Sequence, residues 1–426
     1  MILGGGFAGV ACAERLERLL RPDEAGVTLV SRDNYTLFTP MLPEVSGGDV
    51  EPRHIVSPLR ASLRKTTIVL GDVQALDVER RIVEVQLVLG GEVQRFPYDQ
   101  LVLAMGSVTA TFGVPGVAEW SIPFKRLEDS EALRNRIVET LEIADAVDRA
   151  DETRRAQLLT YLIVGGGYTG VEIAGELVDL LRSVVRFYRT IAYEDTKIVL
   201  IEGGDKLLPD LLPRMGAYSG NFLMRRGVEV RLGTTVSEVD AHGVALKDGS
   251  RIDASTIVWS AGVRPSPLLA GLSIPLTRNG AILVRGDMSV PDFPGLWALG
   301  DCAKIPNPKG GSYPPTAQHA IREGPALANN IVRTLRGEPT KPFAWQALGT
   351  MASLGGQRGI VGFPNGFVLT GFPAWWLWRT YYLLRIPGFY RKIRVALDWL
   401  LALVFPRDIA QLRVDTELAR RDAALR

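Results

Sequence analysis

The sequence predicts an α/β protein built from two β-α-β units and a C-terminal region of amphipathic helices. Two glycine motifs of the pattern G-x-G-x-x-G carry the first part of this prediction, because each stands between an apolar run and a helical pattern. A stretch rich in aromatic and basic residues near the C-terminus carries the second part. The sequence therefore predicts two Rossmann-like dinucleotide-binding domains, followed by a region of different chemistry.

The composition is that of a globular protein. The chain has 426 residues, which favours two to three domains at about 150 residues per domain. Hydrophobic residues make up 46% and charged residues 23%, and this composition excludes wholesale disorder. The formal net charge of only +2 argues against a nucleic-acid partner. Two cysteines exclude a disulfide framework, and three histidines leave little for a metal centre, so no metal is expected. The N-terminus lacks the pattern of a signal peptide, and the uncharged run 359–378 contains glycines and prolines that disfavour a membrane span.

The first glycine motif consists of Gly4, Gly6 and Gly9. Its first glycine permits the tight turn, the second lets the backbone approach a diphosphate, and the third lets helix and strand pack closely. The helix that follows, expected over 11–20, presents its free N–H groups and positive dipole to the phosphates. Only three residues precede these glycines, which is short for an inner strand, so we expect the true start of the chain to lie upstream.

The second motif consists of Gly165, Gly167 and Gly170, before a helix expected over 172–181. The strand after that helix ends at Glu202, where an acid normally holds ribose hydroxyls. A carboxylate repels a 2′-phosphate, so this unit is expected to prefer NADH to NADPH. The equivalent position of the first unit is Ser31, followed by Arg32, and serine binds a ribose hydroxyl more weakly than a carboxylate does.

Three further strands end in small residues. One ends with Ala104 and Gly106, and another with Ala261 and Gly262, where a cofactor could lie against the backbone. A third runs into Gly-Asp, and its Asp301 can accept hydrogen bonds from the hydroxyls of a ribityl chain.

These motifs resemble the two-dinucleotide flavoprotein superfamily, and more narrowly the type II NADH:quinone oxidoreductases. The narrower resemblance rests on residues 37–45 (LFTPMLPEV), 169–172 (TGVE) and 316–318 (TAQ), and on the C-terminal amphipathic region, and it covers essentially the whole chain. It implies FAD in the first unit, with Thr39 and Pro40 among its contacts, and NADH in the second. It further implies a non-proton-pumping respiratory-chain enzyme in which hydride passes from NADH to the flavin and two electrons pass to a membrane quinone.

The resemblance also implies which residues act in catalysis. Glu172 matches the family glutamate near the nicotinamide–flavin contact, whereas Glu176, one turn on, is expected to be structural. Gln318 matches the first glutamine of an Ala-Gln-x-x-x-Gln pattern beside flavin and quinone, but the second position is Arg322 here, which leaves the choice of quinone open. Related sulfide:quinone and disulfide reductases need a redox cysteine pair, whereas Cys12 and Cys302 are expected to serve packing.

The C-terminal region is expected to dock on a membrane surface through residues 375–405. Between 375 and 397 it has five basic residues, no acid and several aromatics, and Pro387-Gly388 divides it into two helical pieces. In the second piece apolar residues recur at helical spacing, with charged residues beside them. A basic polar face with an aromatic and aliphatic face suits a membrane interface, where tryptophan and tyrosine concentrate. Membrane docking has two alternatives: the helices could form a homodimer interface, or they could pack on the core of the protein. Dimerisation through this region is compatible with docking.

The expected domain map places an FAD part at 1–130 and 263–340, with an NADH part at 158–262 inserted in it. Residues 341–426 form the membrane and partner region. If the protein is bacterial, we expect it on the cytoplasmic face of the membrane as a peripheral protein. Two other functions stay open: an NAD(P)H-dependent reductase of a protein electron carrier, and a membrane-bound flavin sensor with little turnover.

Overall fold

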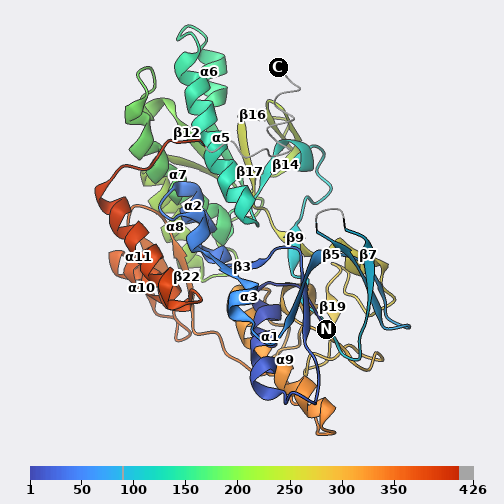
Figure 1. The fold of residues 1–426 in the computed structure, drawn as a ribbon. Coiled ribbons are helices and arrows are strands. Elements are labelled where there is room, and N and C mark those ends of the chain that lie inside the picture. The colour runs from blue at the N-terminus through green and yellow to red at the C-terminus, as the bar shows by residue number, and fades with distance from the viewer. Residues whose placement is uncertain (89–90, 412–426) are drawn as a thin grey trace. The chain divides into compact units, whose positions relative to one another are not determined.

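A computed structural model describes residues 1–88 and 91–411, which form two compact units (Figure 1). The first unit contains Met1–Leu37, Val56–Val108 and Val263–Ala347. The second contains Phe38–Ile55, Thr109–Gly262 and the chain from Leu348 onward.

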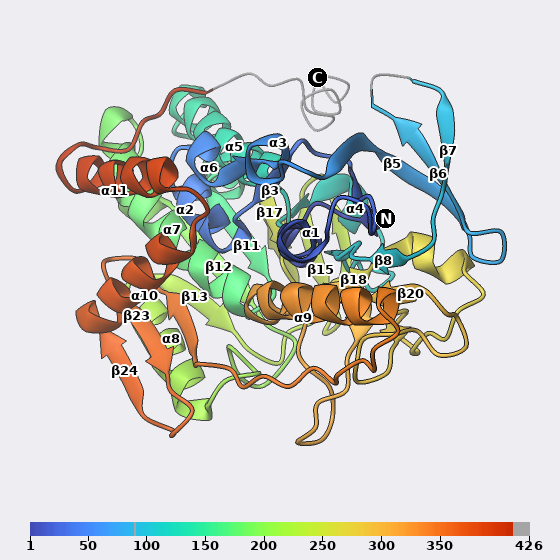
Figure 2. The ribbon, with the colours of Figure 1, turned by 60° about the horizontal axis from the view of Figure 1, so that its bottom comes forward.

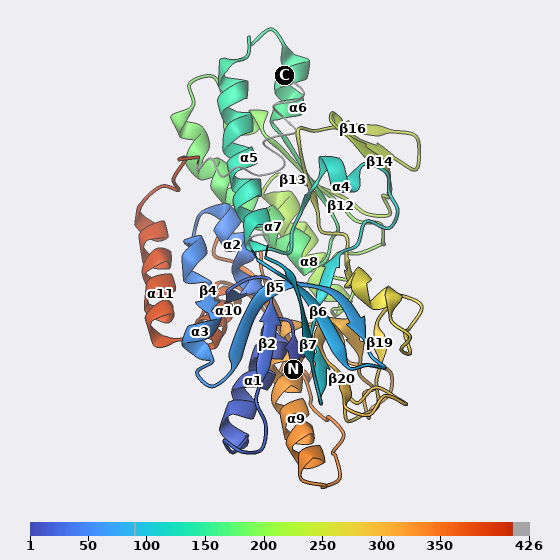
Figure 3. The same ribbon diagram turned by 45° about the vertical axis from the view of Figure 1, so that its right-hand side comes forward.

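The first unit is organised on a mixed sheet of strand order β20-β8-β1-β2-β5-β6-β7. The strands up to β5 pair in parallel, and β5, β6 and β7 form an antiparallel extension that Figure 3 shows. The sheet strands are β1 (Ile2–Leu3), β2 (Thr28–Ser31), β5 (Thr67–Asp77), β6 (Ile82–Leu87), β7 (Val93–Pro97), β8 (Leu101–Leu103) and β20 (Leu296–Ala298).

Two helices of this unit, α1 (Phe7–Leu19) and α9 (Ala317–Leu335), lie side by side (Figure 2). Both contribute to the apolar core, which also takes in the central strands. The remaining elements are short: β3 (Tyr35–Leu37), β4 (Val56–Pro58), α3 (Leu59–Ser62), β18 (Val263–Pro265), η5 (Pro267–Gly271), β19 (Ile282–Leu283), η6 (Gly300–Cys302) and β21 (Ala303–Lys304), with β9 (Ser107–Thr109) where the units divide.

The second unit is organised on a parallel sheet of order β10-β17-β11-β12-β13. Its strands are β10 (Ile122–Pro123), β11 (Thr160–Val164), β12 (Lys197–Ile201), β13 (Val228–Arg231) and β17 (Thr256–Trp259), and β14 (Val236–Asp240), β15 (Gly243–Leu246) and β16 (Arg251–Asp253) form an antiparallel meander. The helices before the C-terminal region are α2 (Leu42–Gly47), α4 (Val117–Trp120), α5 (Leu127–Ala146), α6 (Glu152–Leu158), α7 (Tyr168–Val184) and α8 (Pro213–Arg225), with 3-10 turns η1 (Thr39–Met41), η2 (Pro52–His54), η3 (Val185–Phe187) and η4 (Tyr193–Asp195). In each unit a strand, a glycine turn, a helix and a second strand follow in order, as predicted.

The C-terminal region of the second unit pairs a small sheet with two helices. The antiparallel strands β22 (Thr350–Ser353), β23 (Gly359–Gly362) and β24 (Val368–Gly371) pack against α10 (Phe372–Arg385), and α11 (Phe389–Val404) follows (Figure 2). The helices are separated at Pro387-Gly388, as the sequence predicts. Among the described residues, no helix combines the length and the apolar character needed to cross a membrane.

The units divide the chain differently from the expected domain map. Residues 38–55 and 109–130, expected in the FAD part, lie in the second unit, as does the C-terminal region from Leu348. Residues 412–426 of that region lie outside the described residues. Which cofactor each part binds stays a prediction of the sequence.

Four of the eight tryptophans of the chain lie between residues 375 and 399, in the region expected to dock on a membrane. Three of these four do not take the interfacial position expected of them. Trp375, Trp378 and Trp399 are buried, and only Trp376 is exposed. Arg379, one of the five basic residues, is also turned inward and pairs with Glu44. The buried tryptophans pack α10 and α11 onto the unit. Burying a large aromatic ring stabilises the fold more than leaving that ring at the surface would.

Candidate functional site

The first glycine motif shapes the turn between β1 and α1. Gly4 has a φ of +120°, and a Cβ there would lie 2.2 Å from the carbonyl oxygen of Ala104. A Cβ at Gly9 would lie 2.0 Å from the oxygen of Gly4, so α1 can pack this closely only on glycine. Gly6 precedes α1, and a Cβ there would meet nothing within 4 Å. Open space therefore adjoins the helix N-terminus, where backbone N–H groups can bind an anion such as a diphosphate.

The second motif repeats this geometry between β11 and α7. A Cβ at Gly165 would lie 2.5 Å from the oxygen of Ser260, and one at Gly170 would lie 1.8 Å from the oxygen of Gly165. Gly167 precedes α7, and again a Cβ would meet nothing within 4 Å. Each unit thus has one loop whose outer glycines serve packing and whose middle position faces free space.

The strand-end residues that were expected to hold ribose lie beside these loops. In the second unit the Glu202 carboxylate accepts hydrogen bonds from the backbone N–H groups of Gly166, at 2.6 Å, and Gly204, at 2.7 Å. In the first unit buried Ser31 takes the equivalent place at the end of β2, next to Gly5. The neighbouring Arg32 is exposed.

The other residues predicted for FAD divide between the units. Ala104 follows β8, and Gly106 has a φ of +63° with free space beside its Cα. Asp301, in η6, accepts a hydrogen bond of 2.6 Å from the Ser107 hydroxyl. Thr39 and Pro40 belong instead to η1 of the second unit.

Gln318 and Arg322 lie one turn apart on α9, near its start. Both are partly buried. The Arg322 guanidinium lies over the ring of Trp345, 5.4 Å from its centroid, so the residue that departs from the family pattern stacks on an aromatic side chain. On the same helix the Glu323 carboxylate accepts a hydrogen bond from Gly300 N–H and so fixes the turn that contains Asp301.

In the second unit, Ala261 and Gly262 follow β17 and are partly buried. Gly262 has a φ of +153°, and a Cβ there would lie 3.1 Å from the Phe112 ring. A side chain at Gly262 would therefore crowd the Phe112 ring, and cofactor binding at this strand end stays a prediction.

Glu172 lies in the first turns of α7 and is buried. Its carboxylate accepts a 3.0 Å hydrogen bond from the backbone N–H of Ser353 in β22. Burial above all, with a smaller contribution from the nearby Glu44, raises the pKa of Glu172 to about 8 despite the lowering effect of that hydrogen bond. A carboxyl group with this pKa exchanges a proton near neutral pH, as a general acid or base must.

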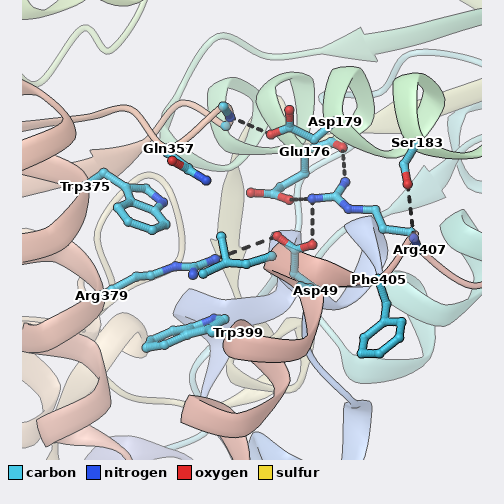
Figure 4. Close-up of a pocket in the computed structure, with 14 residues that line it drawn as sticks. Asp49, Glu176, Asp179, Ser183, Gln357, Trp375, Arg379, Trp399, Phe405 and Arg407 are labelled. Carbon is cyan, nitrogen blue, oxygen red and sulfur yellow. Dashed lines mark hydrogen bonds and ion pairs between the residues drawn. The ribbon is translucent and has the colours of Figure 1, made fainter.

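A group of charged side chains surrounds the next turn of α7, and apart from Glu176 sequence reasoning missed its members. Figure 4 shows Glu176, Asp49, Arg379 and Arg407. Glu176 and Asp49 both contact the Arg407 guanidinium, at 3.2 Å and 2.7 Å. Glu44 and Asp49 both contact Arg379, at 3.4 Å and 3.8 Å. We call these five residues the buried charge cluster. They come from three segments that are far apart in the sequence, at 44–49, 176 and 379–407, and no local pattern joins those segments.

The two cysteines of the chain are buried and neither is in a disulfide. Burial raises the pKa of the Cys302 thiol to about 12, so it has almost no reactive thiolate at neutral pH. This agrees with packing roles for Cys12 and Cys302.

Comparison with known proteins first identifies the broad class of proteins to which this chain is similar. Residues 1–324 match the family described as pyridine nucleotide-disulphide oxidoreductase, and residues 347–408 match the NDH2 C-terminal domain. A solved NDH2 from Plasmodium falciparum, in complex with NADH, superimposes with a TM-score of 0.88 at 20% identity, covering 96% of this chain and 99% of that one.

Curated relatives narrow the class. The type II NADH:quinone oxidoreductase Ndh of Mycobacterium tuberculosis is 31% identical, over 96% of this chain and 88% of its own. A probable NADH dehydrogenase of Dictyostelium discoideum is 32% identical, over 96% and 90%. The chain belongs to the type II NADH:quinone oxidoreductases. This confirms the family, the α/β fold and the enzyme class that the sequence predicts.

Proposed function

We propose that this chain transfers two electrons from NADH to a membrane quinone, with FAD bound by the first unit and NADH by the second. The observation that carries the assignment of two cofactors is the pair of glycine loops, each with free space beside a helix N-terminus. FAD fits the first loop, because its diphosphate needs such a cradle. When bound, FAD would supply the two-electron redox chemistry that links NADH to the quinone.

The first unit offers polar groups for the diphosphate, the ribose, the ribityl chain and the flavin of FAD. The N-terminus of α1 at Gly6 would bind the diphosphate, and Ser31 the ribose. Asp301, oriented by Ser107, would accept a hydrogen bond from the ribityl chain, and Gln318 would lie near the flavin and the quinone.

The second unit would bind NADH through the N-terminus of α7 and through Glu202. Ala261 and Gly262 leave room for the cofactor against the backbone. Glu172 would orient the nicotinamide or hold a proton close to the reacting groups.

Replacing Glu202 with alanine should relax the preference for NADH over NADPH. A hydrogen bond to a charged group contributes about 1.5–3 kcal/mol, so the ratio of the two kcat/KM values should fall by about tenfold to hundredfold. Glu229→Gln is the matched control, because Glu229 lies on the neighbouring strand β13 and pairs with Lys197. An unchanged ratio in Glu202→Ala would count against Glu202 as the ribose ligand.

The membrane is proposed to meet the exposed side of α11. Tyr390, Ile393, Leu397, Leu400 and Val404 are all exposed, between 44% and 76%. The sequence predicted this apolar row, and the structure places it outward, which excludes packing of this row on the unit's core. The exposed Arg385 and the adjoining basic residues would favour anionic lipid, at about 1 kcal/mol for each residue near the surface. We therefore propose a peripheral membrane location, on the cytoplasmic face in a bacterium, and a homodimer through this region is compatible with it.

A further inference from the structure

The order of three strands sets the direction in which NADH would lie across the second unit, and this inference rests on the proposed function. In the parallel sheet, β17, β11 and β12 are neighbours, so their carboxyl ends lie side by side. Glu202, proposed to hold the adenosine ribose, follows β12, and the loop 165–167, proposed to hold the diphosphate, follows β11. NADH bound at both points would place its nicotinamide half beside the end of β17, at residues 260–262.

The end of β17 adjoins the second glycine loop directly. In the parallel pairing, Val164 at the end of β11 lies opposite Trp259 at the end of β17. One residue further on, a Cβ at Gly165 would lie only 2.7 Å from the Cα of Ala261. The backbone of Ala261 and Gly262 is therefore the surface that a ligand would meet next after the loop.

Phe112 is the side chain whose ring lies against this strand end. A Cβ at Gly262 would lie 3.1 Å from the ring. Two hydrogen bonds hold the chain just before Phe112 to the same strand end. The backbone N–H of Ala110 donates to the Gly262 carbonyl oxygen at 3.0 Å, and the Trp259 indole N–H donates to the Ala110 carbonyl oxygen at 2.8 Å. Phe112 is therefore anchored to the end of β17.

The Phe112 ring gains little from its place in the protein alone. It is 69% exposed, and among the described residues up to 347 no other large hydrophobic side chain is as exposed. An aromatic ring left in water forgoes the stabilisation that its burial would supply. Beside a strand end where a ligand is expected, such a ring is available to pack against that ligand.

The backbone of Phe112 is also unusual for a bulky residue. Its φ is +53°, and the φ of the following Gly113 is +72°. These two residues form the centre of a turn that the Val114 N–H closes by donating to the Thr111 carbonyl oxygen at 3.0 Å. Turns with positive φ at both central positions favour glycine, asparagine and aspartate, so phenylalanine is strained here. Strain of this kind is characteristic of ligand sites, and with the exposed ring it points to a binding role.

We propose that the Phe112 ring forms one side of the nicotinamide site and packs against the nicotinamide end of NADH. A flat aromatic ring suits the planar dihydronicotinamide, because two rings pack favourably in offset or edge-on arrangements. The ring contributes no proton or electron. It holds the nicotinamide in one orientation, and a fixed orientation of the reacting groups favours hydride transfer.

Phe112→Asn tests this role, because asparagine lacks the ring and adopts a positive φ more readily than phenylalanine does. The probe is the tetrahydronicotinamide form of NADH, which cannot donate a hydride, so that titration calorimetry on the FAD-loaded protein measures binding without turnover. Phe112→Asn should raise the Kd of this analogue by about tenfold, the effect of losing one aromatic contact. ADP-ribose, which has both riboses and the diphosphate but no nicotinamide, should bind to the variant as it does to the wild type.

Two further variants separate loss of the ring from damage to the fold. Phe112→Tyr keeps the ring and should bind the analogue like the wild type. Phe187→Asn is the matched control, because Phe187 is also an exposed phenylalanine of the second unit but lies in η3, after the far end of α7. It should leave the Kd unchanged. The Tm of Phe112→Asn should equal or exceed that of the wild type, since the turn is relieved of strain.

The inference is overturned if Phe112→Asn binds the analogue as tightly as the wild type does. It is also overturned if the variant loses affinity for ADP-ribose by the same factor, because the ring would then act on the whole dinucleotide site rather than on the nicotinamide. Equal losses in Phe112→Tyr or Phe187→Asn would overturn it as well. A wild type that binds neither the analogue nor ADP-ribose would contradict the proposed function itself.

Discussion

Gly6→Ala should fold like the wild type and lose most of its FAD. Gly6 has a φ of −80°, which alanine adopts freely, and the added methyl group meets no atom of the protein. That methyl group would, however, occupy the space assigned to the diphosphate. Overpacking typically costs about 1–3 kcal/mol, which weakens binding by roughly ten- to hundredfold. Flavin absorbance per mole of purified protein measures the loss.

Gly4→Ala is the matched comparison, because its methyl group would collide with the protein itself. At a φ of +120° and 2.2 Å from the Ala104 oxygen, alanine should lower the Tm of the flavin-free protein as well as its FAD content. If Gly6→Ala kept a full complement of FAD, the first loop would not be the diphosphate site. If it lowered the Tm of the flavin-free protein, the variant would report on folding rather than binding.

Ile393→Asp, Leu397→Asp and Leu400→Asp combined should release the protein from membranes. The three side chains are 44%, 51% and 60% exposed, so charged replacements leave the core intact. Burying a side chain of this size in an apolar environment contributes about 1.5–3 kcal/mol, and losing three should lower liposome binding by well over a hundredfold. Sedimentation with liposomes that contain anionic lipid measures the change.

Met224→Gln is a suitable control for this experiment, since Met224 is 50% exposed on α8, outside the proposed docking face. NADH oxidation with a water-soluble quinone analogue should be the same in all three proteins. Deleting the region from residue 375 would be less informative, because the deletion removes buried Trp378 and the Arg407 ion pairs as well. A triple variant that still sediments with liposomes would refute the docking face.

How far the sequence predicted the molecule depends on how local the interactions are. The glycine loops and Glu202 were predictable, because a tight turn and its strand end depend on residues close together in the chain. The exposed row of α11 was predictable from helical spacing for the same reason. The environment of Glu172 was not, because Ser353 and Glu44 come from distant segments that only folding brings to it.

The tryptophans illustrate a second limit. Their clustering in a basic segment suggested an interface with lipid, but composition cannot tell the outer face of a helix from the inner one. In the structure Trp375 and Trp399 enclose the Arg379 guanidinium, at 4.3 Å and 4.5 Å from the ring centroids, and so help to cover the buried charge cluster. The apolar row of Tyr390, Ile393, Leu397, Leu400 and Val404 remains at the surface of α11.

The most direct test of the central claim follows the flavin colour of the purified protein without oxygen. NADH should bleach the flavin absorbance, and a soluble quinone analogue should then restore it and yield quinol. NADH binding without bleaching would contradict the account and indicate a flavin-binding sensor. Bleaching that no quinone reverses, but that a protein electron carrier does, would also contradict it and indicate a carrier reductase.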